Sequence, residues 1–296
     1  MSDALILIPT HDHAAYLPFA VRSALGQRGA SIEVVVVGDG VGDDTRAAIR
    51  PFLADPRVRF LDLPKGERLG ERHRHAVLLE TSAPVIAYLA DDDVLAWDHV
   101  VSLLALLEDA DFAHAPRVEV RPPDDFVFVP MDFGRPRYLE HHALAIWNPI
   151  GLTGVAHTLA AYRRLPHGWR TTPAGTPTDY YMWRQFIEQP WFRGRTGRQL
   201  TALIFPDPLW KGRPVAERVA CLERYLAALG GDGLEQWRRE HVVEVWRKAA
   251  LDREEAWMGL QLQTRAITRT RTWRAREAIV RRLPAWLLRS RRGGAH

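Results

Sequence analysis

The sequence has a single cysteine, no long apolar run and no recognisable leader. Cys221 is the one cysteine among 296 residues, which excludes a disulfide framework and a cysteine-rich metal site. No apolar run approaches the roughly 18–20 residues that a membrane-spanning helix needs. The first residues carry no basic region followed by an apolar stretch and a cleavage site. We therefore expect a cytoplasmic protein without a transmembrane helix.

The C-terminal stretch has almost no acids. Residues 264–296 contain ten arginines and one acid, Glu277. The formal net charge of +4 is therefore the balance of +9 in this tail and −5 in residues 1–263. An acidic body argues against nucleic acid as a partner, whereas a strongly basic tail indicates an attachment segment.

The tail also carries apolar side chains. Between Trp273 and Arg292, tryptophans and aliphatic residues alternate with arginines, and Pro284 interrupts any helix there. Two short amphipathic pieces of this kind suit the interface of an anionic membrane. The pattern thus predicts peripheral attachment to the inner face of the membrane. The alternative is that the tail packs on the acidic body.

The body of the chain alternates apolar runs with segments of helical spacing. This alternation is typical of an α/β fold with a mostly parallel sheet and right-handed crossovers. Prolines make residues 118–150 look irregular, and the pattern from Val215 onward is helical. The expected strands cover residues 4–8, 32–37, 58–63, 85–89, 111–115 and 200–205.

Three consecutive carboxylates, Asp91, Asp92 and Asp93, follow the expected strand at 85–89. Adjacent acids repel one another and need a partner when they are buried. Mg²⁺ and Mn²⁺ prefer such hard oxygen ligands, and ligands of open α/β sheets bind at the carboxyl ends of strands. We therefore expect a metal that holds a diphosphate. The alternative is that these acids only begin the next helix.

Two further motifs follow the first and second strands. His11-Asp12-His13 resembles a metal-binding pair of histidines, but the second half of the chain lacks the βα repeats of a barrel. We favour polar residues that line the mouth of the sheet. Gly38-Asp39-Gly40 lacks the spacing of a dinucleotide fingerprint, and Asp39 is suited to accept hydrogen bonds from a base or ribose.

Taken in order, these motifs resemble glycosyltransferase family 2. The resemblance covers residues 4–115 well and is faint to about 205. It departs from the family at Gly38, where the frequent turn has Asp, and at His75, where Asn is common. The resemblance implies the GT-A fold, a nucleotide-diphosphate sugar donor, Mn²⁺ or Mg²⁺, and transfer with inversion. It rests on Ile8-Pro9-Thr10, the 35–45 segment, Arg74-His75, and the 86–93 segment with its acids.

The resemblance also implies roles for single residues. Asp93 is expected as the main metal ligand, and Asp91 as a contact of ribose or metal. Asp179, which opens a helix after residues 172–178, is the expected general base on the acceptor side. The expected nucleotide-sugar contacts are Pro9, Thr10, His11, Asp39, Arg74, Asp91 and Asp92. Aromatic faces stack on sugars and a histidine can meet a phosphate, so the candidate acceptor contacts are Trp147, His157, Trp169 and Trp183.

The sequence thus predicts a GT-A domain over residues 1–210 and a helical C-terminal segment over 211–296. Residues 1–115 would bind the donor, and 116–210 a glycan or lipid-linked acceptor. The expected reaction moves a sugar to an acceptor hydroxyl, in the synthesis of a cell-envelope or extracellular glycan. The alternatives are a nucleotidyltransferase and a catalytically dead module that binds nucleotide or glycan at a membrane.

Overall fold

The computed structural model describes residues 2–123, 125–129, 131–135, 148–241, 253, 258 and 260–264. The chain divides into a compact unit, Met1–Val245, and a second unit, Trp246–His296, and the description below concerns the first. Trp147 and the arginine-rich tail lie outside the described residues. None of the described helices is both long enough and apolar enough to cross a membrane.

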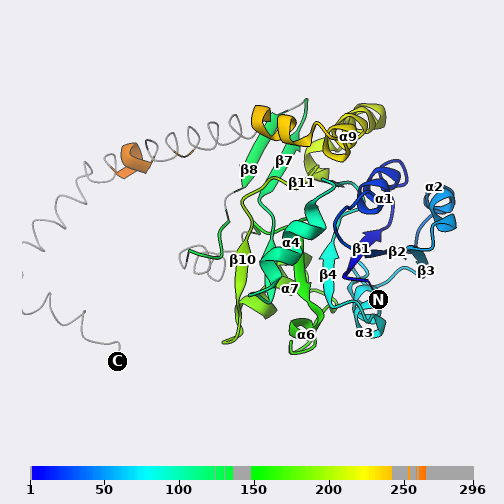
Figure 1. Cartoon of the computed structure of the whole chain (residues 1–296), viewed down its shortest axis with the longest axis horizontal. Helices are drawn as coiled ribbons and strands as arrows, with labels where there is room; N and C mark the ends of the chain where they lie inside the picture. Colours follow the sequence, from blue (N-terminus) through cyan, green and yellow to red (C-terminus); the bar gives the residue numbers. More distant parts are fainter. Residues whose placement is uncertain are drawn as a thin grey trace, which may run out of the picture. The chain divides into compact units, whose positions relative to one another are not determined.

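The centre of the first unit is a seven-stranded sheet in the order β10-β6-β9-β4-β1-β2-β3 (Figure 1). Strand β1 pairs in parallel with β2 and β4, and β2 pairs in parallel with β3. Strand β9 lies antiparallel between β4 and β6, and β10 pairs in parallel with β6. The strands are β1 (Ala4–Thr10), β2 (Ile32–Asp39), β3 (Val58–Leu63), β4 (Val85–Tyr88), β6 (Phe112–His114), β9 (Val155–Thr158) and β10 (Gly194–Thr196).

Helices cover both faces of this sheet, as the labels in Figure 1 show. A short 3₁₀ helix, Arg50–Ala54, follows α2. The helices are α1 (Leu17–Leu25), α2 (Asp43–Ile49), α3 (Glu71–Glu80), α4 (His99–Leu107), α6 (Leu159–Tyr162), α7 (Thr178–Ile187), α8 (Asp207–Trp210) and α9 (Val215–Gly230).

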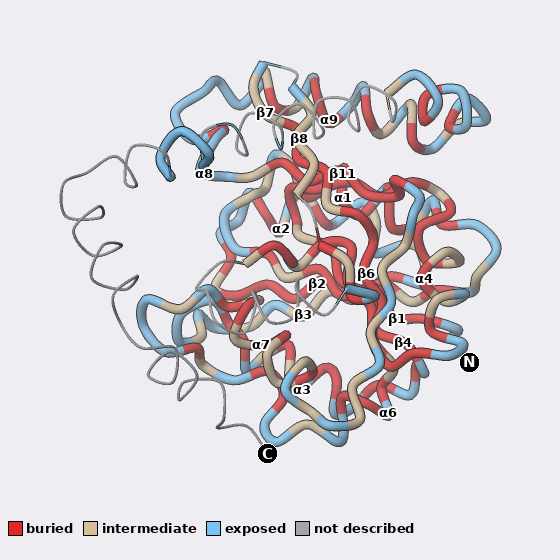
Figure 2. The backbone as a smooth tube through the Cα atoms, turned by 90° about the vertical axis from the view of Figure 1, so that its left-hand side faces the viewer, coloured by how far each residue is buried: buried red, intermediate tan, exposed pale blue. Residues whose placement is uncertain are grey.

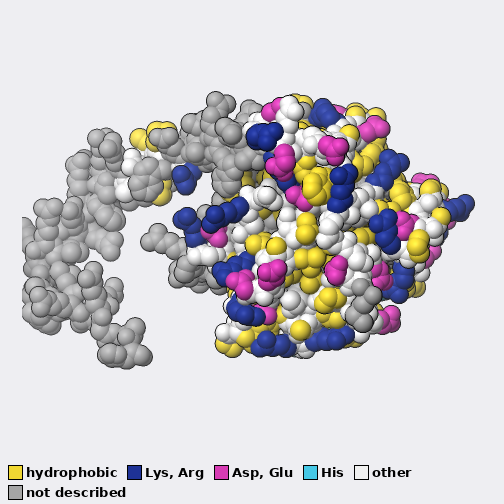
Figure 3. All heavy atoms as spheres, in the orientation of Figure 1, with side chains coloured by type: hydrophobic (Ala, Val, Ile, Leu, Met, Phe, Trp, Pro, Cys, Tyr) yellow, Lys and Arg dark blue, Asp and Glu magenta, His cyan; other side chains and the backbone are white. Residues whose placement is uncertain are grey.

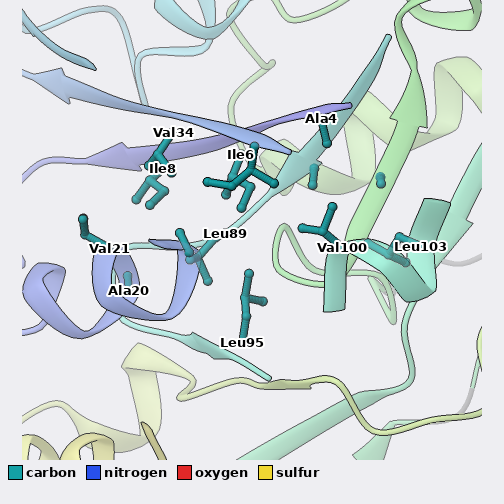
Figure 4. Packing of buried hydrophobic residues seen from close by; sticks show 14 of the residues in the cluster. Ala4, Ile6, Ile8, Ala20, Val21, Val34, Leu89, Leu95, Val100 and Leu103 are labelled. Carbon is teal, nitrogen blue, oxygen red and sulfur yellow. The ribbon is translucent and has the colours of Figure 1, made fainter. Parts of the chain in front are cut away.

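Strand β1 is apolar and fully buried from Ala4 to Ile8 because both of its faces lie in a core. Its residues alternate between the two sides of the sheet. Ile6 and Ile8 belong to the core that also contains α1 and α4 side chains such as Val21 and Val100 (Figure 4). Leu7 belongs to the other core, with side chains of α3 and α7. The tube through β1 and β4 is accordingly drawn as buried in Figure 2.

A third core joins the C-terminal helix to two small sheets. One pairs β5 (Val94–Leu95) with β11 (Ala202–Leu203), and the other is the hairpin of β7 (Arg117–Arg121) and β8 (Asp125–Val129). Helix α9 contributes Leu222 and other buried side chains to this core. The first compact unit therefore continues to Val245, past residue 210, where the sequence suggested a boundary.

The structure corrects the prediction for residues 118–150. That stretch contains β7 and β8, and the pair Pro122-Pro123 lies between the two strands. Proline removes a strand donor but suits the connection between strands, so these prolines separate two strands and do not prevent them. The sequence also gave no indication of β9, where His157 interrupts a short apolar pattern.

Charges of both signs are interspersed on the face seen in Figure 3. On the described surface as a whole, Arg46 pairs with Asp62 at 2.7 Å and Arg195 with Asp109 at 2.6 Å. The described surface on this face therefore presents no single broad field of one sign.

The central position of β1 predicts where truncation is costly. Leu7 is fully buried, so Leu7→Ala should lower the free energy of unfolding by about 2–5 kcal/mol through lost burial and a cavity. Leu79 on α3 is 59% exposed, and Leu79→Ala should change it by no more than about 0.5 kcal/mol. Urea unfolding of both variants measures the difference. Equal costs would contradict the assigned positions.

Candidate active site

The parallel strands β1, β2 and β4 bring the predicted residues to one edge of the sheet. Thr10 ends β1, Asp39 ends β2, and Asp91 to Asp93 follow β4. Ligands of open α/β sheets bind outside the carboxyl ends of such strands. The hydroxyl of Thr10 is buried and has no hydrogen-bond partner among the described residues, and Pro9 beside it is half-buried. This edge is therefore the candidate site.

Asp39 is held by a loop that leads into α3. Its Oδ2 accepts from Lys65 Nζ at 2.5 Å, and its Oδ1 accepts from the Gly66 amide at 2.5 Å. Burial raises the pKa of Asp39, but these hydrogen bonds outweigh burial and lower it overall. The backbone carbonyl of Asp39 accepts from His11 Nδ1 at 2.7 Å. His11 and Asp39 thus lie together, and their contact with a nucleotide sugar stays a prediction.

Gly70 lets this loop approach Asp39 closely. It adopts a φ of +68°, and a Cβ added there would lie 2.7 Å from the Asp39 side chain. The left-handed backbone and the close contact both favour glycine. The loop therefore fixes the carboxylate before α3 begins at Glu71.

Arg74 on α3 is buried and lies beside Trp169. Its guanidinium is 4.8 Å from the centre of the Trp169 ring, and its Nη2 donates to the Leu69 carbonyl at 2.7 Å. Burial lowers the pKa of Arg74, against the charges of Asp179 and Glu71 nearby. Its Nε has no hydrogen-bond partner among the described residues, which leaves one donor available to a ligand.

Asp179 begins α7 opposite Arg74 and is half-buried. Burial raises the pKa of Asp179 above its usual range, although the charges of Arg74 and Arg117 lower it. A carboxylate with a raised pKa accepts a proton more readily near neutral pH. The role of Asp179 as a general base, expected from the sequence, stays a prediction that this environment permits.

The three consecutive acids have three different partners. Asp91 Oδ1 is 2.9 Å from His13 Nδ1, and Asp92 Oδ2 accepts from Arg218 Nη2 at 2.5 Å. Asp93 accepts from Thr153 Oγ1 at 2.5 Å and from the Phe205 amide at 2.7 Å. Burial and the neighbouring charge of Asp92 raise the pKa of Asp93 to about 8.

Both oxygens of Asp93 accept hydrogen bonds and its side chain is buried, and its expected role as the main metal ligand stays a prediction. The structure brings His13, Asp92 and Asp207 together, with one ligand atom of each within 4.8 Å of the others. One imidazole nitrogen and two carboxylate oxygens suit Mn²⁺ or Mg²⁺. The donor set therefore fits a divalent cation.

The surroundings of His13 favour its protonated form. Burial lowers the pKa of His13, but the hydrogen bond with Asp91 and the charges of Asp91 and Asp92 outweigh burial and raise it to about 9. A metal ligand must be the neutral imidazole, so binding of a cation here would release a proton. Because Nδ1 is bonded to Asp91, Nε2, which is 3.6 Å from Asp207 Oδ1, is the nitrogen that can bind the cation.

The structure buries three of the four predicted acceptor contacts. Trp183 and His157 are fully buried, and Trp169 is 2% exposed. The indole of Trp169 donates to the Tyr88 hydroxyl at 3.0 Å, and that hydroxyl is 2.8 Å from His157 Nε2. These side chains pack and pair inside the core, so they are not available to stack on an acceptor. Trp147 lies outside the described residues.

Sequence reasoning did not select Asp207, Arg218 or Thr153. Asp207 follows the expected strand at 200–205, much as Asp91 follows β4, and this signal was available. Arg218 sits in an ordinary amphipathic helix, and Thr153 lies in a loop. No local sequence pattern marks Arg218 or Thr153, because each is hydrogen-bonded to an acid more than 50 positions away in the chain.

Fold and site together define a class of protein, the GT-A glycosyltransferases. TarS of S. aureus superimposes with a TM-score of 0.55 at 12% identity, over 76% of this chain and 39% of that chain. The mannosyltransferase PcManGT of Pyrobaculum calidifontis, in complex with GDP-Man and Mn²⁺, gives a TM-score of 0.51 at 15% identity, over 93% of this chain and 82% of that chain. At 12% and 15% identity, the similarity to these two structures shows the fold alone.

The profile of Glycosyl transferase family 2 matches residues 5–167, more than half of the chain. The protein belongs to glycosyl transferase family 2, which confirms the resemblance noted in the sequence and favours glycosyl transfer over nucleotidyl transfer. The succinoglycan biosynthesis protein ExoO of Rhizobium meliloti (strain 1021) is 34% identical over 113 residues. That match covers 38% of this chain and 31% of ExoO, so the chain spans about a third of that relative.

The hydrogen bonds of the Thr153 hydroxyl predict how much this residue contributes to the stability of the protein. It donates to Asp93 and also accepts from the Ala90 amide at 2.9 Å. Thr153→Val keeps the shape but leaves both buried groups without this partner, which should cost about 1–3 kcal/mol for each. Thr171→Val, which removes a surface bond to Glu67, is the matched control and should cost no more than about 0.5 kcal/mol. Chemical unfolding measures both, and an unchanged stability in Thr153→Val would contradict the assigned contacts.

Proposed function

We propose that the protein is an inverting, cation-dependent glycosyltransferase. It moves a sugar from a nucleotide-diphosphate donor to an acceptor hydroxyl. The observation that carries this proposal is the cluster of His13, Asp92 and Asp207 at the carboxyl edge of a family 2 sheet. Asp179 on α7 completes the site from the acceptor side, and Arg74 on α3 lies near it on the donor side.

Thr10, His11 and Asp39 support a nucleoside pocket at the ends of β1 and β2. The buried hydroxyl of Thr10 has no partner among the described residues, so it can bond a base or ribose. Both carboxylate oxygens of Asp39 already accept hydrogen bonds from the loop that contains Lys65. Asp39 can therefore bond the donor if this loop shifts, or the donor can bond Lys65 instead. A TarS structure in complex with UDP-GlcNAc and the PcManGT complex with GDP-Man support this class of donor.

His13, Asp92 and Asp207 would hold a divalent cation such as Mn²⁺ or Mg²⁺. When bound, the cation supplies positive charge that stabilises the leaving diphosphate. Asp91 positions His13 by its bond to Nδ1, in the way that carboxylates commonly orient ligating histidines. Asp93 holds the segment itself, through Thr153 and Phe205, and is a structural member of the site.

Inversion requires a base that takes the acceptor proton on the side of the sugar opposite the leaving group. Asp179 is proposed for this role because its pKa is raised by burial and its neighbours are the arginines Arg74 and Arg117. Those arginines also favour the ionised form, which keeps the carboxylate ready to accept a proton. Arg74 can at the same time offer its free Nε to the donor.

Extracellular glycan synthesis is the proposed context, because ExoO is a succinoglycan biosynthesis protein. A glycan or lipid-linked acceptor fits that context. Attachment of the arginine-rich tail to an anionic membrane, on its inner face, remains a prediction from the sequence.

The direct test is release of nucleoside diphosphate from UDP-GlcNAc and GDP-Man, with Mn²⁺ and with a chelator. Release that depends on Mn²⁺ supports the proposal. Binding of either donor without any release, in the presence of acceptor oligosaccharides, would instead indicate a module that has lost its catalytic activity. Failure of both donors to bind would count against this class of donor.

The positioning of His13 predicts a specific loss in Asp91→Asn. Removing the carboxylate that orients a ligating histidine should weaken Mn²⁺ binding by about 10–100-fold. Asp44→Asn, at an exposed acid on α2, is the control and should bind Mn²⁺ as the wild type does. Calorimetric titration in the presence of GDP or UDP measures this affinity. Equal affinities in the two variants would remove Asp91 and His13 from the cation site.

The general base is tested by Asp179→Asn. The variant should bind donor like the wild type and lose about 10²–10⁴-fold in turnover, the usual contribution of a positioned base. Glu188→Gln, which removes an acid from the exposed end of the same helix, should keep its turnover. Donor affinity comes from calorimetry and turnover from diphosphate release. A large loss of donor affinity in Asp179→Asn would place this residue on the donor side.

A further inference from the structure

Arg218 on α9 reaches the acids of the candidate cation site from the C-terminal part of the chain. Its Nη2 donates to Asp92 Oδ2 at 2.5 Å, and its Nη1 lies 3.2 Å from Asp207 Oδ1. These two acids are also the carboxylates of the cluster with His13. One guanidinium therefore occupies both of the carboxylates that a divalent cation would need.

The guanidinium is fixed and does not project as a mobile arm. The side chain is 2% exposed, and Nη2 also donates to the Phe205 carbonyl at 2.6 Å. The ring of Tyr16 covers it at 4.4 Å. Helix α9 is anchored beneath it by Leu222 and Tyr225, which are buried in the third core.

A fixed guanidinium changes the electrostatics of the site. Arginine cannot lose its charge in a protein, so this charge is present at every working pH. A divalent cation beside it experiences repulsion, which is strong where water is largely excluded, and also competes for the same carboxylate oxygens. A diphosphate brings further negative charge and oxygen ligands to the open side of the cluster, where Asp207 is 53% exposed.

We propose that Arg218 sets the order of binding at this site by suppressing uptake of a free divalent cation. The cation binds firmly only together with a diphosphate, whose charge offsets that of Arg218. Arg218 is thus a positioning residue for the cation and not a ligand of it. The identity of the diphosphate as part of a sugar donor rests on the function proposed above, whereas the effect on the cation alone does not.

A second buried arginine provides the matched control. Arg238 pairs with Asp98 at 2.7 and 2.8 Å and donates to the Leu200 carbonyl, so it resembles Arg218 in burial and bonding. Asp98 is not a member of the cation cluster. Arg238→Gln therefore reports the effect of breaking a buried pair in the same unit without altering the cation site.

The experiment is a calorimetric titration of the full chain with Mn²⁺, alone and with saturating GDP or UDP. Wild-type protein should bind Mn²⁺ at least about tenfold more tightly with the diphosphate than without it. Arg218→Gln should bind Mn²⁺ alone at least about tenfold more tightly than wild type, and the gain from the diphosphate should shrink accordingly. Arg218→Lys keeps the charge but pairs with only one carboxylate. Its affinity for Mn²⁺ alone should therefore also rise, by less than that of Arg218→Gln. Arg238→Gln should match the wild type.

Several outcomes would overturn the inference. Mn²⁺ affinity that is unchanged or weaker in Arg218→Gln assigns the arginine a structural role alone, as does an equal gain in Arg238→Gln. Thermal unfolding of each variant checks that it is folded. If Arg218→Gln does not fold, two measurements remain: the Mn²⁺ affinity of Arg218→Lys, and the gain in wild-type Mn²⁺ affinity when GDP or UDP is present. If neither the increase in Arg218→Lys nor the gain in the wild type is seen, the inference is overturned.

The Asp91→Asn titration separates this inference from the proposed function. If Asp91→Asn weakens Mn²⁺ binding while the Arg218 variants do not strengthen it, the cation site is retained and the role of Arg218 is lost. If GDP and UDP fail to bind while Arg218→Gln gains Mn²⁺ affinity, the proposed donor fails and the effect of Arg218 on the cation is upheld.

Discussion

The burial of three adjacent carboxylates at the end of β4 is the constraint on which the rest of this structure depends. Asp91, Asp92 and Asp93 cannot all remain ionised and buried without partners, because each repels the others and each loses hydration. The fold meets this constraint with a different partner for each acid. A histidine faces the first, an arginine the second, and a hydroxyl with a backbone amide the third.

Those partners come from segments that are far apart in the sequence. His13 follows β1, Thr153 precedes β9, and Arg218 lies on α9. The acids therefore connect the segment after β1, the segment before β9 and helix α9. Together with the apolar side chains that α9 contributes to the third core, the contact of Arg218 with Asp92 joins α9 to the first compact unit, which continues past residue 210. It also explains why a change in the C-terminal helix is expected to alter chemistry at the opposite end of the chain.

The same constraint distributes roles among the acids. A carboxylate whose two oxygens accept bonds from the protein, as in Asp93, is suited to hold the backbone. Asp91 contacts His13, whereas Asp92 contacts Arg218 and lies near Asp207. Identical side chains at consecutive positions thus differ in their contacts, because successive residues point in different directions and meet different neighbours.

The sequence by itself determined the class of fold, the edge of the sheet that carries the site, and the family. Apolar runs that alternate with helical spacing can be read locally, and Thr10, Asp39 and the acids after β4 follow strands that must end at one edge. Asp179 at the start of α7 was likewise visible as an acid after a proline-rich loop. Tertiary structure alone decided which partner each of the three acids has, that Trp169, Trp183 and His157 are core residues, and that Arg218 contacts Asp92. These outcomes depend on contacts between distant segments and on the direction of each side chain, and neither is encoded in local spacing.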